Sequence, residues 1–228
     1  MWSGIVRCRR LTGDMMQEIQ SITEAGRFGA SYRGFIFDLD DTLYNEKDYV
    51  RSGYHAVAVH FRQDASFEKM LWDAFLEGKS AFNHVLPEVG MGSEEMIREA
   101  VAVYREHDPE LSLAEDVRDM LLDLRKSHKV GIITDGRPEG QKKKIRALGL
   151  DRIIEPEDIV ITDLLGGIEY RKPNPKAYQL LQQRWNTEYS EMVYIGDNPA
   201  KDFLAPEALG MGSIRLMNKE GLYWDRKV

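Results

Sequence analysis

The stretch Gly34-Phe35-Ile36-Phe37-Asp38-Leu39-Asp40-Asp41-Thr42-Leu43-Tyr44 decides the fold. Its apolar residues predict a buried strand over 33–38. Three carboxylates then follow within four residues. Carboxylates crowded at the end of a buried strand repel one another unless a cation lies among them. A hard divalent cation held by oxygen ligands would remove that repulsion. The alternative is an acidic loop that simply caps the strand.

The spacing of apolar residues differs between two parts of the rest of the chain. From 48 to 108, apolar residues recur at helical spacing, and no strand pattern interrupts them. After 109, apolar runs at 129–134, 158–162, 192–196 and 212–216 alternate with helical stretches, the last of them over 199–209. Strands that alternate with helices predict an α/β fold with a parallel sheet whose two faces are both covered. We therefore expect a core of 33–48 and 110–228, with an all-helical insertion at 49–109.

Residues 1–32 precede the first predicted strand, and we treat them as an N-terminal extension without an assigned function. Asp14 can cap a helix that runs to about Ala25, with Gly26 as its stop.

The composition narrows the classes of partner. The 228 residues carry a formal net charge of −7 and contain no tract of Lys and Arg, so a nucleic acid or an anionic membrane is not an expected partner. No apolar run reaches the length of a transmembrane helix. Cys8 is the single cysteine, which excludes an internal disulfide and suits a cytoplasmic protein. A monomer and a homodimer are both compatible with the sequence.

Polar side chains follow several of the predicted strands. The first strand ends in Asp38 and Asp40, the second in Thr134-Asp135, and the fourth is followed by 197–202, while Lys172 lies in a loop after the third. Ligands of open parallel sheets bind beyond the carboxyl ends of the strands. We therefore expect these residues to meet at one edge of the sheet.

Each of these residues has a chemical role in phosphoryl transfer. Asp38 can attack phosphorus and form an aspartyl-phosphate, and Asp40 can protonate the leaving oxygen and later activate water. We expect Mg²⁺ to be bound by Asp38, by Asp197 and by the backbone carbonyl of Asp40. We expect Thr134, Asp135 and Lys172 to bind the phosphate of the substrate, and Thr134 and Lys172 to take part in catalysis as well. Asp202 is expected to hold Lys172 or a metal-bound water in place.

Structural roles are the alternatives for four of these residues. Thr134 can cap a turn, Asp135 can shape the loop, Lys172 can be a surface lysine, and Asp202 can stabilise a helix near its N-terminus.

Four segments together resemble the motifs of the haloacid dehalogenase (HAD) superfamily. They are Phe37–Leu43, Ile132–Gly136, Lys172-Pro173 and Gly196–Asp202. In the second motif, Asp135 occupies a position where the family more often has Asn. The resemblance covers about 33–217 and implies a Rossmann-like core with a mobile helical cap of class I. It also implies Mg²⁺-dependent attack by Asp38.

The expected function is hydrolysis of a small phosphorylated metabolite by a Mg²⁺-dependent phosphatase. Asp40 argues against dehalogenation, because family dehalogenases lack this second acid. A sugar phosphomutase on the same scaffold and a non-catalytic binding module are the alternatives.

Overall fold

The computed structural model describes residues 16–222. Cys8 and the start of the N-terminal helix that we predicted from Asp14 lie outside the described residues.

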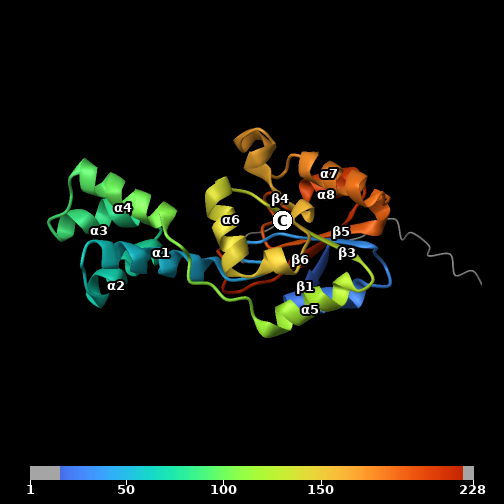
Figure 1. The fold of residues 1–228 in the computed structure, drawn as a ribbon, viewed down its shortest axis with the longest axis horizontal. Helices are drawn as coiled ribbons and strands as arrows, with labels where there is room; N and C mark the ends of the chain where they lie inside the picture. Colours follow the sequence, from blue (N-terminus) through green and yellow to red (C-terminus); the bar gives the residue numbers. More distant parts are fainter. Residues whose placement is uncertain (1–15, 223–228) are drawn as a thin grey trace, which may run out of the picture.

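The core is a six-stranded sheet in which every neighbouring pair of strands is parallel (Figure 1). The strands are β1 Gln17–Ile19, β2 Gly34–Phe37, β3 Lys129–Thr134, β4 Ile159–Ile161, β5 Met192–Gly196 and β6 Gly212–Leu216. Their order across the sheet is β1-β6-β5-β2-β3-β4, which places β2 between β5 and β3. The predicted α/β fold with a parallel, Rossmann-like sheet is confirmed.

Helices cover both faces of the sheet because its central strands are apolar on both sides. Phe35 and Phe37 of β2 pack in a hydrophobic cluster with the 3₁₀-helix η1, with α5 and with α6. Ile36 packs on the opposite face against α7 and the start of α8. The bounds are η1 Ile22–Phe28, α5 Glu115–Arg125, α6 Pro138–Ala147, α7 Lys176–Trp185 and α8 Leu204–Leu209. Short 3₁₀-helices lie at Leu150–Arg152, Pro156–Asp158, Thr162–Leu165, Ile168–Tyr170 and Tyr189–Glu191.

Four further helices form a group of their own beside the sheet (Figure 1). They are α1 Glu46–His60, α2 Ala65–Leu76, α3 Ala81–Glu88 and α4 Glu94–Glu106. Their apolar faces meet in a separate hydrophobic cluster that includes Val57, Phe67, Leu71 and Leu86. We call this group the helical cap. Its division from the core at 48/49 and 109/110 stays a prediction. None of the helices in the described part of the chain has the length and apolar character needed to cross a membrane.

The predicted helix over 14–25 is wrong for the residues that the structure describes. Residues 17–19 form β1, which pairs with β6 at the edge of the sheet, and η1 begins only after the capping residue Ser21. Ile19, Ile22 and Ala25 are buried in the core. The apolar spacing that suggested a helix therefore arises from a short strand followed by a 3₁₀-helix.

The predicted helix over 199–209 begins five residues later than expected, at Leu204. Residues 198–203 form a turn instead, in which the backbone N–H of Asp202 donates to the carbonyl of Asn198 at 3.0 Å. In this turn the side chain of Asp202 accepts from the backbone N–H of Asn198 and from Lys172 Nζ.

Candidate active site

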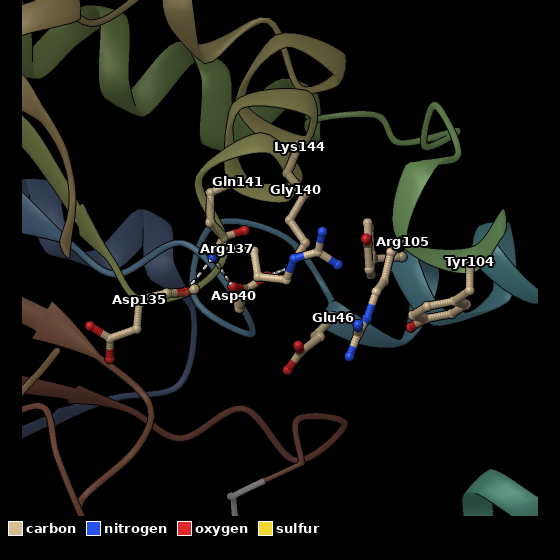
Figure 2. A pocket seen from close by; sticks show the side chains of 11 residues that line it. Asp40, Glu46, Tyr104, Arg105, Asp135, Arg137, Gly140, Gln141 and Lys144 are labelled. Carbon is tan, nitrogen blue, oxygen red and sulfur yellow. Dashed lines mark hydrogen bonds and ion pairs between the residues drawn. The ribbon is translucent and has the colours of Figure 1, made fainter. Parts of the chain in front are cut away.

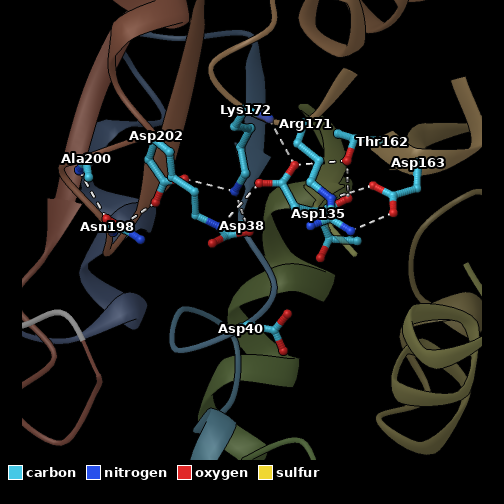
Figure 3. A network of polar contacts seen from close by, with 12 residues as sticks. Asp38, Asp40, Asp135, Thr162, Asp163, Arg171, Lys172, Asn198, Ala200 and Asp202 are labelled. Carbon is cyan, nitrogen blue, oxygen red and sulfur yellow. Dashed lines mark hydrogen bonds and ion pairs between the residues drawn. The ribbon is translucent and has the colours of Figure 1, made fainter. Parts of the chain in front are cut away.

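The candidate site lies at the carboxyl ends of adjacent strands. Asp38 follows β2, Thr134 ends β3, and Asp197 follows β5. Because β2 lies between β3 and β5, these residues meet although they are far apart in the sequence. The loop that carries Lys172 reaches the same edge of the sheet, as Figure 3 shows.

Lys172 is the centre of the polar network in Figure 3. Its Nζ lies 2.7 Å from Asp38 Oδ1, and it donates to Asp202 Oδ1 and to the hydroxyl of Tyr194, both at 2.8 Å. The side chain of Lys172 has no exposed surface. Burial opposes its charged form, but Asp202 and Asp38 hold the pKa of Lys172 well above its usual value. Lys172 is therefore a charged residue of the site and not a surface lysine.

Asp202 already uses both carboxylate oxygens within the protein. Oδ1 accepts from Lys172, and Oδ2 accepts from the backbone N–H of Asn198 at 2.9 Å. The carboxylate also lies against Gly196, where an added Cβ would approach Oδ2 to 2.4 Å. This arrangement agrees with a supporting role for Asp202, which holds Lys172 and the loop after β5 in place.

Three buried carboxylates, Asp38, Asp197 and Asp202, lie around one point, with one oxygen from each within 4.8 Å of the others. Oδ2 of Asp197 is buried and has no hydrogen-bond partner among residues 16–222. Burial and the neighbouring acids raise the pKa of Asp197 to about 8, and burial raises the pKa of Asp38 to about 6 despite the nearby Lys172. An unpartnered carboxylate oxygen among crowded acids fits a bound cation, and oxygen ligands suit Mg²⁺.

Asp40 takes part in a different set of contacts from Asp38. Tyr44 donates to its Oδ1, Lys144 Nζ lies 2.7 Å from the same oxygen, and Gln141 Nε2 donates to Oδ2 at 2.9 Å. Burial opposes the ionised form, but Lys144, Tyr44 and Gln141 outweigh it and hold the pKa of Asp40 below its usual value. In this arrangement Asp40 is a carboxylate that can accept a proton.

Thr134 and Asp135 have clear structural partners. Thr134 is fully buried, and its hydroxyl oxygen accepts from Gln141 Nε2 at 2.7 Å. The carboxylate of Asp135 accepts from Thr162 Oγ1 at 2.9 Å, from the backbone N–H of Lys172 at 3.0 Å and from Lys201 Nζ at 3.2 Å. These bonds join the loops after β3, β4 and β5. The assignment of Thr134 and Asp135 to a phosphate site stays a prediction.

Sequence reasoning missed Gln141 and Lys144. Both are buried on α6 and contact Asp40, although they lie in a segment with several lysines. A signal was present, because Gln141, Lys144, Ile145 and Leu148 follow the i, i+3, i+4, i+7 spacing of one helix face. All four are buried, so the polar pair belongs to the inward face.

A cavity of about 290 Å³ opens between this part of the core and the helical cap. Asp40, Gln141 and Lys144 line it from the core, and Tyr104 and Arg105 line it from α4 (Figure 2). The aromatic ring of Tyr49 lies 4.2 Å from Lys144 Nζ, which links α1 to α6. A molecule bound in this cavity would lie against Asp40.

Comparison with known proteins agrees with this geometry. Residues 35–216 match the family model of haloacid dehalogenase-like hydrolases. The chain belongs to this family. The resemblance seen in the four sequence motifs is therefore confirmed, and this HAD-like hydrolase is an enzyme by family.

Two curated relatives of this HAD-like hydrolase are named as phosphatases. A glyceraldehyde 3-phosphate phosphatase of Methanocaldococcus jannaschii is 26% identical over 211 residues, which cover 85% of this chain and 87% of the relative. Pyrophosphatase PpaX of Bacillus pumilus is 25% identical over 177 residues, which cover 77% of this chain and 78% of the relative.

Among solved structures, the HAD-hydrolase YfnB of Bacillus subtilis, bound to magnesium, superposes with a TM-score of 0.60. The match has 20% identity and covers 82% of this chain and 87% of that one. At this level of identity the likeness concerns the fold.

Proposed function

We propose that this HAD-like hydrolase is a Mg²⁺-dependent phosphatase that releases phosphate from a small phosphomonoester through an aspartyl-phosphate on Asp38. The contact of Asp38 with Lys172, within a cluster of buried acids, is the observation that supports it most. The phosphatases among its curated relatives support the same class of reaction.

The residues around Asp38 fit a metal ion. Asp197 keeps a buried oxygen without a partner, and Asp38 presents a carboxylate beside it, so these two acids would hold Mg²⁺ together with the backbone carbonyl of Asp40. When bound, Mg²⁺ would neutralise the repulsion between the carboxylates and an anionic phosphate. Asp202 would stay outside this ligand set because its oxygens bind Lys172 and Asn198.

The protein residues divide the chemistry between them. Asp38 attacks the phosphorus atom, and Lys172 beside it stabilises negative charge on the phosphoryl oxygens. Thr134, at the end of the neighbouring strand, donates its hydroxyl hydrogen to a phosphoryl oxygen. Asp40 protonates the leaving oxygen in the first step and takes a proton from water in the second. Its contacts with Lys144 and Gln141 favour the ionised form that the second step needs.

The cap suits a small phosphorylated metabolite. The cavity beside Asp40 measures about 290 Å³, which is at the lower end of the size range of small-molecule sites. A leaving group of a few carbon atoms fits such a space, whereas a folded phosphoprotein does not.

Phosphate release from p-nitrophenyl phosphate, measured with Mg²⁺ and with EDTA, tests this proposal. We expect turnover only with the metal, and a loss of at least about 10³-fold in kcat for Asp38→Asn, because the amide cannot act as the nucleophile. A matched control is Asp163→Asn, which changes an acid that pairs with Arg171 on the neighbouring loop. Full turnover by Asp38→Asn would exclude covalent catalysis by this residue.

Two further assays on the wild-type protein test the alternatives, a phosphomutase and a non-catalytic binding module. Product analysis on hexose phosphates would identify a phosphomutase by isomerised sugar without net release of phosphate. Mg²⁺ binding without turnover of any phosphate ester in a broad panel would identify a non-catalytic binding module.

A further inference from the structure

The cavity between α6 and α4 lies where the leaving group of a substrate would be. Asp40, the proposed acid and base, forms part of its wall. The portion of the substrate beyond the leaving oxygen therefore extends toward the cap. The side chains on that side of the cavity determine which leaving groups are bound well.

Two arginines face each other across this cavity. Arg105 comes from the last turn of α4 in the cap, and Arg137 is the capping residue of α6 in the core. Figure 2 shows both guanidinium groups projecting into the space between the two helices. Among residues 16–222, neither guanidinium forms an ion pair or a hydrogen bond. Two unpaired cations that line one small cavity repel each other, and a bound anion would relieve that repulsion.

The carboxylates of the cavity do not neutralise both arginines. Asp40 is paired with Lys144, and Asp135 is paired with Lys201. Glu46 remains, and its side chain has no ion pair or hydrogen bond in the described part of the chain. Burial and the nearby Asp40 raise the pKa of Glu46 to about 7, so its ionised form is less favoured here than in water.

The start of α6 adds to the positive potential. Its first turn lines the cavity through Gly140, and helix N-termini favour anions because their backbone N–H groups are unpaired. A Cβ at Gly140 would meet no atom within 4 Å, so this turn borders open space.

We infer that Arg105 and Arg137 together bind a second anionic group of the substrate, a carboxylate or a phosphate, on the leaving-group side. This inference rests on the proposed phosphatase function and names its substrate class: a small phosphate ester with a second anion a few atoms away from the ester oxygen. Since the two arginines belong to the core and to the cap, such a substrate would also connect these two parts of the protein.

Matched pairs of substrates test the inference. For the carboxylate, 2-phosphoglycolate is compared with 2-hydroxyethyl phosphate, which replaces the carboxylate with a neutral group. For the phosphate, propane-1,3-diyl bisphosphate is compared with 3-hydroxypropyl phosphate. We expect wild-type kcat/KM to favour the anionic member of at least one pair by about 10- to 100-fold, the range for a charge-assisted hydrogen bond. The pair that shows this preference identifies the anion.

Substitution then assigns the preference to the arginines. Arg105→Gln and Arg137→Gln should each reduce the anionic-to-neutral ratio of kcat/KM by about 10-fold, mainly through KM for the anionic member, and Arg105→Lys should restore part of it. Arg98→Gln, on the same helix but ion-paired to Glu94, is the matched control and should leave the ratio unchanged. Circular dichroism confirms that each variant folds.

The outcomes separate this inference from the function on which it rests. Equal kcat/KM for both members of both pairs, or an equal loss for both members in Arg105→Gln, would refute the anion site while leaving the phosphatase intact. If no ester is hydrolysed, the proposed function fails, and calorimetry then tests the anion site alone. Phosphonoacetate should bind at least about 10-fold more tightly than 2-hydroxyethylphosphonate, and Arg105→Gln should remove that difference. Equal binding of the two would refute the site.

Discussion

The substitution Asp197→Asn tests whether the acid cluster is built for a cation. In the metal-free protein, Asp197 is a buried carboxyl with one oxygen unpartnered, and its pKa is raised from 3.8 to about 8. The amide has nearly the same shape but carries no charge. We therefore expect Asp197→Asn to stabilise the protein in EDTA and to abolish most of its stabilisation by Mg²⁺.

The magnitude follows from proton linkage. A carboxyl whose pKa is raised on folding destabilises the folded state as the pH rises from its unfolded pKa of 3.8 to its folded pKa of about 8. At pH 7 the cost is about 4 kcal/mol, since each pKa unit corresponds to about 1.4 kcal/mol. In the variant, the buried amide lacks hydrogen-bond partners, and this costs about 2 kcal/mol, which offsets about half of the stabilisation gained by removing the charge. The net gain of about 2 kcal/mol corresponds to a rise in Tm of roughly 4–8 °C for a protein of this size.

The assay is thermal unfolding followed by circular dichroism at pH 5, 6, 7 and 8, in EDTA and in Mg²⁺. Wild-type stability in EDTA should fall across this range, and the variant should show a smaller slope. Mg²⁺ should raise the Tm of the wild type by mass action but hardly that of the variant.

The control for this prediction is Asp158→Asn. Burial also raises the pKa of Asp158, but its carboxylate accepts from Trp185 Nε1 at 2.9 Å, outside the acid cluster. This variant should respond to Mg²⁺ like the wild type. A lower Tm for Asp197→Asn in EDTA, together with an unchanged response to Mg²⁺, would refute the reasoning.

Three further predictions concern stability. Lys172→Met leaves Asp38 and Asp202 without their buried cation and should lower the free energy of unfolding by about 3–5 kcal/mol, measured by urea titration in EDTA. An unchanged midpoint would show that these ion pairs do not stabilise the fold. Ile19→Ala should cost about 2–5 kcal/mol because Ile19 is 1% exposed, whereas Glu18→Ala on the exposed side of β1 should change stability by less than about 0.5 kcal/mol. Equal effects of these two would mean that β1 is not part of the folded core. Gly140→Ala should raise the urea midpoint through a gain of about 1 kcal/mol in helix propensity, and its methyl group should raise KM for substrates that fill the cavity; a lower midpoint would indicate a clash.

The central strands could be predicted from the sequence because each is a nearly continuous apolar run. The bounds of β3, β5 and β6 agree with the predicted 129–134, 192–196 and 212–216. β1 could not be predicted in this way. It has three residues, two of them polar, and it forms only because β6 offers an open edge. Such a strand is determined by its pairing with a neighbouring strand, and the local sequence pattern does not predict it.

Some residues of the candidate site could likewise be predicted from the sequence, and others could not. Asp38, Asp197, Lys172 and Asp202 follow or precede recognisable strands, so their meeting at one edge follows from parallel topology. The partners of Asp40 were missed because glutamine and lysine on a charged helix usually face solvent. Their burial depends on how α6 packs against the sheet, which the order of elements alone does not specify.

The position of β2 in the middle of the sheet has a consequence for how the enzyme matures. Both strands that flank it come from much later in the chain, so Asp38 leaves the ribosome long before Lys172 and Asp197 exist. The cap helices between them make mainly local contacts and can fold while synthesis continues. The proposed site is therefore complete only after β5 and the loop that follows it have been synthesised, and a chain interrupted before β5 lacks Asp197 and Asp202.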